Sequence, residues 1–150
     1  MEKTDVTTRT AELAGVIYKN MKTSADSVLN LLSKAEDDRL KSHMTGLLDG
    51  YEKFASEAKK ILDSEGVAPR EENIIEKMGA KVGRGMRTLT DSSTSRLGEV
   101  LMDDSTAGFC EALRLLHQYE NKDCRPEMLQ LVRDIISFEE NNYNTAKSFI

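Results

Sequence analysis

The 150-residue sequence contains no tryptophan, two prolines, four phenylalanines and four tyrosines. Proline interrupts helices, and aromatic and β-branched residues favour strands, so their scarcity leaves little to support a sheet. Leu, Ala, Lys, Glu and Met are well represented, and these side chains lose little rotamer freedom in a helix. The composition therefore predicts an all-α protein, and the length is that of one ordinary domain.

No stretch approaches the ~18 consecutive apolar residues of a membrane span. The beginning of the chain, "MEKTDVTTRTAEL", is polar and has no basic segment followed by an apolar one, so we expect no signal peptide. The net charge of −5 argues against a nucleic-acid binder, which needs clustered Lys and Arg to neutralise phosphates. We therefore expect a cytoplasmic protein that binds neither membranes nor nucleic acid.

The sequence has two cysteines, Cys110 in a predicted helix and Cys124 in a predicted loop. One long-range disulfide and two free thiols are both compatible with these positions. We expect two isolated thiols, the usual state in a reducing compartment, although the sequence alone leaves their pairing open.

Apolar residues recur every three or four positions along four long segments, as they do in amphipathic helices. The first stripe is Leu13, Ile17, Met21, Val28, Leu31 and Ala35, and the second is Leu40, Met44, Leu47, Tyr51, Phe54, Ala58 and Ile61. Between them, Asp37 or Asp38 can cap the second helix. Gly66 suits its C-cap, and Pro69 cannot continue it. The short break predicts that these two helices are antiparallel neighbours.

The third helix is expected over residues 95–120, and the fourth begins with Pro126 in its first turn. Their stripes are Leu97, Leu101, Leu113 and Leu116 in the third, and Leu129, Val132, Ile136, Glu139, Tyr143, Ala146 and Phe149 in the fourth. Because the connection over 66–95 is long, the third helix can run parallel to the second, which is the single-crossover arrangement of ferritin-like bundles.

The crossover contains several glycines and a short amphipathic pattern, for which we expect a short extra helix (Ile74, Ile75, Met78 and Val82). Its "GAKVGRG" lacks the Lys-Ser/Thr of a P-loop and a preceding strand, so a phosphate site is not expected. We expect residues 1–150 to form a single helical-bundle domain in which 1–8 are flexible and 66–95 form the crossover.

The run "LLDGYEKFASEAKKILDSEGVAP" resembles the second helix and following turn of ferritin-like bacterial proteins. The order of "GVAP", "GRGM", "LMDDSTAGFCEAL" and a final helix is similar to a family of uncharacterised ferritin-like bacterial proteins. The resemblance covers about 28–150. It implies a bacterial protein with a ferritin-like four-helix bundle, and it implies little about activity because that family has no settled function.

Ferritin-like di-iron sites use a Glu from each of two helices and a Glu-x-x-His pair from each of the other two. At the corresponding places the first predicted helix has Ser24 or Asp26, and the third has Asp104 or Asp103. At the places of the two Glu-x-x-His pairs, the second helix has Tyr51 and Phe54, and the fourth has Glu139 and Asn142. Only Asp104 and Glu139 are plausible carboxylate ligands there, and no histidine accompanies them. We therefore expect no metal site, no cofactor and no catalytic residue.

The two histidines, His43 and His117, each stand alone on a helix without a second ligand three or four residues away. For each we expect partial burial and an ordinary hydrogen bond. The methionines are spaced like core residues, so they do not indicate a copper or haem site.

Glu139 lies on an apolar stripe, so we expect it to be at least partly buried. Burial of an ionised carboxylate is costly unless a metal, a cation or a hydrogen bond compensates it. Arg96 and Arg114 are the candidate cations, and the Tyr51 hydroxyl and Asn142 are the candidate hydrogen-bond partners. We favour hydrogen bonding, with desolvation raising the pKa of Glu139.

The leading hypothesis is a non-enzymatic bundle protein that has lost the dinuclear metal site. It would act through protein–protein contacts as a homodimer or small homo-oligomer. One alternative is a metal-binding or oxidative-stress protein with a degenerate site at Asp104 and Glu139. Another is a small-molecule carrier that uses a cavity beside Tyr51 and Phe54.

Overall fold

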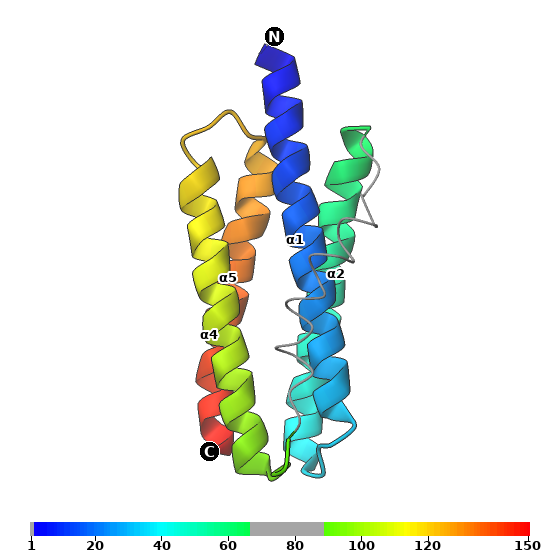
Figure 1. The fold of residues 1–150 in the computed structure, drawn as a ribbon, viewed down its shortest axis with the longest axis vertical. Helices are drawn as coiled ribbons and strands as arrows, with labels where there is room; N and C mark the ends of the chain where they lie inside the picture. Colours follow the sequence, from blue (N-terminus) through cyan, green and yellow to red (C-terminus); the bar gives the residue numbers. More distant parts are fainter. Residues whose placement is uncertain (1, 67–88) are drawn as a thin grey trace.

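The computed structural model describes residues 2–66 and 89–150, with side chains from residue 6 onward. Every regular element in these ranges is a helix, which confirms the all-α prediction (Figure 1). The elements are α1 (Glu2–Leu32), α2 (Asp38–Ser64), α4 (Thr94–Tyr119), α5 (Pro126–Ala146) and the 3₁₀-helix η1 (Lys147–Phe149). The expected extra helix of the crossover lies outside the described residues.

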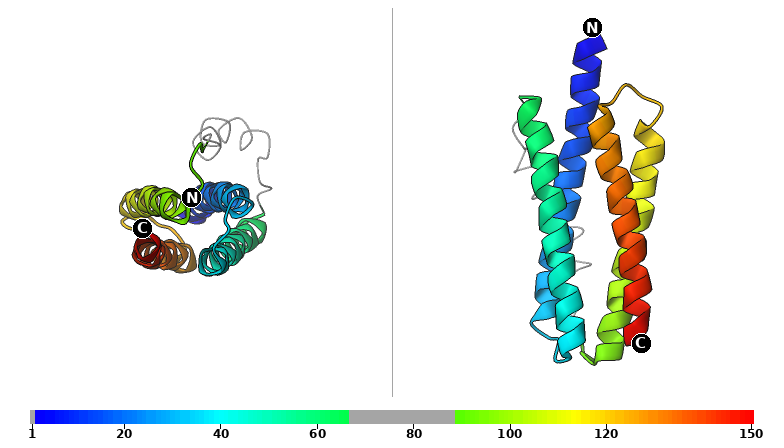
Figure 2. Two further views of the ribbon diagram at one scale, coloured as in Figure 1. Left: turned by 90° about the horizontal axis from the view of Figure 1, so that it is seen from below. Right: turned by 180° about the vertical axis from the view of Figure 1, so that it is seen from behind.

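The four long helices form two antiparallel hairpins, α1 with α2 and α4 with α5, whose helices pack closely along their lengths. Helices α2 and α4 both begin at the lower end of the bundle in Figure 1 and run upward, so the predicted parallel direction is confirmed. Seen end-on, the helices surround a common core, with α1 beside α4 and α2 beside α5 (Figure 2). The two hairpins contact each other more extensively along α2 and α5 than along α1 and α4.

The helix ends follow local signals in the sequence. Asp37 is the N-cap of α2, and its side chain accepts a hydrogen bond from the backbone N–H of Leu40 at 2.9 Å. Gly66 follows the C-cap of α2 with a φ of +73°, a conformation that favours glycine. Ser93 caps α4, and Pro126 occupies the first turn of α5. The expected roles of Asp37, Gly66 and Pro126 are thereby confirmed.

The core of the bundle contains the predicted stripe of α1 completely. In α2 and α5 the buried face is rotated relative to the prediction. In α2, Ala55 and Leu62 are buried, whereas Phe54 and Ile61, which were expected to be buried, are half-buried. In α5, the predicted residues Leu129, Ile136 and Tyr143 are half-buried. The buried residues of α5 that were not on the predicted stripe are Met128, Leu131, Ile135 and Asn142. The difference arises because each helix packs against two neighbours, and the sequence pattern does not show on which side of a stripe the second neighbour lies.

Helix α1 already begins at Glu2, and the expected flexibility of residues 1–8 stays a prediction. None of the described helices combines the length and the apolar character that crossing a membrane requires.

Gly50 of α2 lies against the ring of Phe138 of α5, so a Cβ at this position would overlap the ring. The ring also packs edge-on against Tyr51 and Phe54, with centroid distances of 5.3 and 5.2 Å. Gly50→Ala should lower the free energy of unfolding by about 1 kcal/mol, the low end for overpacking, because Phe138 is half-buried and can shift.

The matched control is Gly46→Ala on the same helix, where a Cβ would meet nothing within 4 Å among the described residues. This change should stabilise the protein by up to ~1 kcal/mol, because alanine is the better helix former. Urea denaturation of both variants measures the difference. Equal effects of the two substitutions would show that Gly50 is not required for the close approach of α2 and α5.

Candidate functional site

The most unusual core residue is Glu139 of α5, whose exposed fraction is 1%. The hydroxyl of Tyr51, from α2, donates a hydrogen bond to Oε1 of Glu139 at 2.6 Å. Nδ2 of Asn142 donates to the same oxygen at 3.1 Å, as the i, i+3 spacing on one helix face allows. The predicted burial of Glu139 and both predicted hydrogen-bond partners are confirmed. Oε2, the other oxygen, has no hydrogen-bond partner in the described part of the chain.

Oε2 of Glu139 lies against Gly108 of α4. A Cβ built at Gly108 would overlap Oε2 and approach Cδ of Glu139 to 2.9 Å. The carboxyl group thus occupies the space where a side chain of residue 108 would lie, and α4 can pack over it only because residue 108 is glycine. Gly108 was not predicted from the sequence. Its signal was a glycine in the middle of a helix, where neither a turn nor a cap requires one.

Burial raises the pKa of Glu139 to about 7, while the hydrogen bonds from Tyr51 and Asn142 oppose the rise and the charge of Asp104 adds to it. Burial, together with the charge of Glu139 and its hydrogen bond, raises the pKa of Tyr51 well above its ordinary value. The predicted direction for Glu139 is confirmed. This carboxyl group therefore changes its protonation state near neutral pH, and the Tyr51 hydroxyl remains protonated there.

The two arginines considered as partners of Glu139 form ion pairs on the surface of their own helix instead. Arg96 pairs with Glu99 at 2.9 Å, and Arg114 pairs with Glu111 at 3.7 Å. Both lie one turn from their partners, where an i, i+3 contact forms without crossing the bundle. Neither arginine contacts Glu139 through a described ion pair, so hydrogen bonds are its observed compensation.

The structure brings some of the predicted metal-site residues together and separates others. Asp104 is half-buried on α4, one turn before Gly108, and its charge acts on both Glu139 and Tyr51. Phe54 turns toward Phe138, and Asp26 and Asp103 are exposed. Within residues 2–66 and 89–150, no group of three or more His, Cys, Asp and Glu side chains is placed to hold a metal ion.

A pocket of about 290 Å³ opens between α1 and α4, and α2 and α5 contribute to its floor. The floor is formed by buried apolar side chains (Ile17, Met21, Leu47, Leu101, Leu115 and Ile135). Half-buried polar residues of α1 (Asn20, Thr23, Ser24 and Ser27) and Asp104 of α4 form the rim. Tyr51 and Gly108 also line the pocket, so it reaches two residues that contact Glu139. A cavity was expected beside Tyr51 and Phe54, and only Tyr51 lines this one.

The histidines lie in different surroundings. His117 is exposed. His43 is half-buried, and its ring stacks on that of Phe149 at 5.8 Å between centroids. Burial lowers the pKa of His43, and its Nε2 is buried without a partner among the described atoms. The expectation of an ordinary hydrogen bond is therefore wrong for this nitrogen, which is buried without one.

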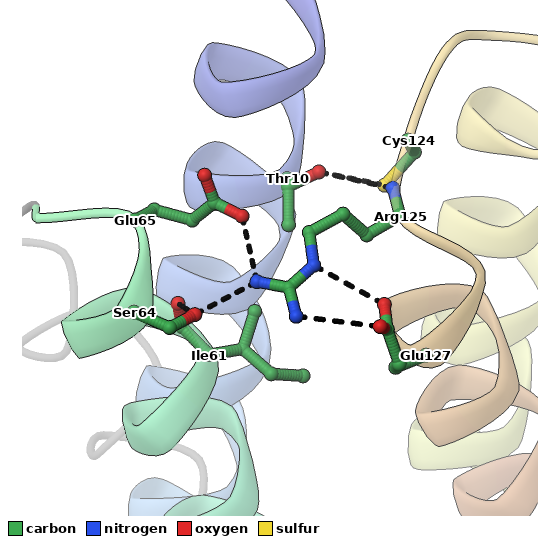
Figure 3. Close-up of polar contacts among 7 residues, drawn as sticks. All are labelled: Thr10, Ile61, Ser64, Glu65, Cys124, Arg125 and Glu127. Atoms are coloured by element: carbon green, nitrogen blue, oxygen red, sulfur yellow. Dashed lines mark hydrogen bonds and ion pairs between the residues drawn. The ribbon is translucent and has the colours of Figure 1, made fainter.

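A second polar cluster connects the end of α2 to the start of α5, at the upper end of the bundle as drawn in Figure 1 (Figure 3). Arg125, just before α5, donates hydrogen bonds from Nη1 to Ser64 Oγ at 2.7 Å and Glu65 Oε1 at 2.8 Å, at the end of α2. Its Nε and Nη2 donate to the carboxylate of Glu127 at 3.2 and 3.3 Å. These contacts join α2 to the start of α5, and their geometry indicates a structural role.

The two cysteines are free thiols in the structure, as expected. Cys110 is exposed, whereas Cys124 is half-buried and accepts a hydrogen bond from the hydroxyl of Thr10 at 3.6 Å. Burial raises the pKa of the Cys124 thiol. Since the thiolate is the reactive form, Cys124 should resist alkylation at neutral pH.

In the native protein, iodoacetamide should therefore label Cys110 first and Cys124 several-fold more slowly. After denaturation without reductant, both cysteines should be labelled at comparable rates, as mass spectrometry of the peptides would show. Protection of both residues under denaturing conditions would mean that they form a disulfide.

Comparisons of the chain with models of protein families, with curated proteins and with solved structures gave no match. The described geometry defines a class: a four-helix bundle with parallel α2 and α4, a hydrogen-bonded carboxyl group in its core, and a pocket beside that group.

Proposed function

We propose that this chain is a non-enzymatic, ferritin-like bundle protein whose core site is maintained by hydrogen bonds instead of metal ions. The supporting observation is that Oε1 of Glu139 accepts hydrogen bonds from both Tyr51 and Asn142. In a ferritin-like site the residue three positions after the glutamate is a histidine ligand. Here that residue is Asn142, which binds Glu139 itself. A hydrogen-bonded, protonated carboxyl group needs no cation to offset its burial.

Metal titration tests this proposal. The protein, purified without chelator, is titrated with Fe(II), Mn(II) and Zn(II), and bound metal is measured by elemental analysis. We expect no stoichiometric binding that depends on the core carboxyl groups. Stoichiometric metal that is lost in both Glu139→Gln and Asp104→Asn, and retained in Asp103→Asn, would overturn the proposal in favour of the metal-binding or oxidative-stress alternative.

The proposal includes the mode of action: a bacterial cytoplasmic protein that works through protein–protein contacts, as a homodimer or small homo-oligomer. The long helices α2, α4 and α5 have exposed residues along their whole lengths, which provide faces for such contacts. Analytical ultracentrifugation over a hundredfold concentration range tests the self-association. A single species of monomer mass at every concentration would remove the homo-oligomer from the proposal.

A second candidate function, a small-molecule carrier, is favoured by the pocket between α1 and α4. Native mass spectrometry of the freshly purified protein would detect a bound compound of defined mass. Ser24→Trp should fill the pocket from its half-buried rim and prevent that binding, whereas Asp26→Trp, exposed on the same helix, should leave it intact. Equal retention in both variants would place the compound outside this pocket.

A further inference from the structure

The hairpin of α4 and α5 has an outer face that is turned away from α1 and α2 (Figure 2). On α5, Phe138 marks the side that faces α2, because its ring packs against Tyr51 and Phe54. Successive residues of an α-helix are turned by about 100°, so residues two positions apart point to nearly opposite sides. Ile136 and Glu140, each two positions from Phe138, therefore point to the outer face.

Helix α4 contributes two large apolar side chains to the same face. Glu111 lines the pocket that opens toward α1, so Phe109 and Leu113, each two positions from it, point to the opposite side. Both are half-buried, and neither belongs to the apolar side chains that form or pack against the described core. The outer face thus carries apolar surface that the core of its own chain does not cover.

Charged and apolar side chains alternate along α5 on this face. Leu129, Ile136 and Tyr143 are half-buried and follow one another at intervals of seven residues, about two helical turns. Arg133 and Glu140 are exposed between them, and neither has an ion-pair partner among the described residues of its own chain. Such a surface fits a protein partner that presents apolar side chains and charges of the opposite sign.

The pattern on α5 is complementary to its own reverse. Arg133 is three positions before Ile136 and Glu140 is four positions after it, so a second, antiparallel α5 centred on Ile136 places each arginine level with a glutamate. Leu129 and Tyr143, each seven positions from the centre, are then level with each other. A parallel second copy would instead place like charges opposite one another, which opposes association.

Helix α4 indicates the same centre. Because Glu139 lies against Gly108 and the two helices are antiparallel, the centre on α5, three positions before Glu139, is level with Glu111, three positions after Gly108. Phe109 and Leu113 are two positions on either side of Glu111. The same two-fold arrangement therefore places the phenylalanine of each copy level with the leucine of the other.

We propose that the outer face of the α4–α5 hairpin binds a second, antiparallel copy of this chain, with Arg133 against Glu140 and Phe109 against Leu113. Two-fold symmetry repeats each of these contacts, so the dimer contains two ion pairs and two apolar pairs. This inference rests on the self-association proposed above and names its surface and geometry.

The test reverses the charges one at a time and then combines the variants. Arg133→Glu and Glu140→Arg should each weaken self-association about 10–100-fold, since both ion pairs of the dimer become repulsive. An equimolar mixture of the two variants should associate within about threefold of the wild type, because the mixed dimer again pairs Glu with Arg at both places. Sedimentation equilibrium over a range of concentrations gives the dissociation constants.

Lys60→Glu and Asp49→Arg are the matched controls, because both residues are exposed on α2 of the other hairpin. Both controls should associate like the wild type, and circular dichroism melts check that all four variants are folded. If the wild type dimerises but the mixture of Arg133→Glu and Glu140→Arg is no tighter than either variant alone, this surface is overturned and the homodimer uses another face. A wild type that stays monomeric at every concentration overturns both the surface and the self-association.

Discussion

Gly108→Ala should lower the free energy of unfolding by about 1–3 kcal/mol, even though alanine is the better helix former. The new Cβ would overlap Oε2 of Glu139, and the carboxyl group is unable to retreat without losing its hydrogen bonds to Tyr51 and Asn142. The cost therefore combines overpacking with the disruption of a buried polar network. Thermal or urea denaturation at pH 6, where Glu139 is mainly protonated, measures it.

A double-mutant cycle assigns that cost to the contact with Glu139. In a Glu139→Ala background the overlapping atoms are absent, so Gly108→Ala should be neutral or stabilise the protein by up to ~1 kcal/mol. Gly15→Ala serves as a control, because a Cβ at that position meets no described atom within 4 Å. If Gly108→Ala destabilises equally in both backgrounds, the requirement for glycine arises elsewhere in the packing of α4.

The wild-type protein should lose roughly 3 kcal/mol of stability, relative to Glu139→Gln, as the pH rises from below 4.5 to above 7. Burial raises the pKa of this carboxyl group to about 7 in the folded protein, against an ordinary value of 4.5. Between these pH values the folded state keeps a proton that the unfolded state has released, so raising the pH favours unfolding. Above pH 7 the folded protein contains a buried carboxylate, and the loss is complete.

Glu139→Gln removes this titration and keeps an acceptor for Tyr51 and Asn142. The variant should match the wild type at about pH 4 and exceed its stability at pH 8, as thermal melts across the pH range would show. Tyr51→Phe removes a hydrogen bond that lowers the pKa of Glu139, so the transition should move to higher pH. A large loss of stability in Glu139→Gln at both pH values would instead show that Glu139 holds a cation.

Local sequence signals predicted much of this molecule. The caps Asp37 and Gly66 and the start of α5 at Pro126 depend on the residues nearest to them, and all three agree with the structure. The burial of Glu139 followed from its place on an apolar stripe. Its partners could be named because Asn142 is on the same helix face, and because Tyr51 is on the stripe of a helix that must share the core.

Other features depend on how separate helices meet, which periodicity does not encode. The partner of Gly108 is Glu139 on another helix, and the size of the pocket depends on the separation of α1 and α4. Arg125 joins Glu65 across 60 positions of the chain, a pairing that requires the end of α2 and the start of α5 to lie at the same end of the bundle. The partial exposure of Phe54 and Ile136 likewise follows from the rotation of α2 and α5 about their axes.

The unequal contact between the hairpins has a kinetic consequence. Along one edge, α2 and α5 are in contact and are joined at the top by Arg125; along the opposite edge, α1 and α4 contact each other less. The pocket opens on this less packed edge, between α1 and α4, so a ligand that enters there breaks no backbone hydrogen bond of a helix. Side-chain motions of this kind take picoseconds to nanoseconds at exposed positions, whereas collective movements of whole helices take microseconds to milliseconds. Motions of exposed side chains around the opening of the pocket are therefore fast, whereas access of solvent to Glu139, whose exposed fraction is 1%, requires slower movements of the helices.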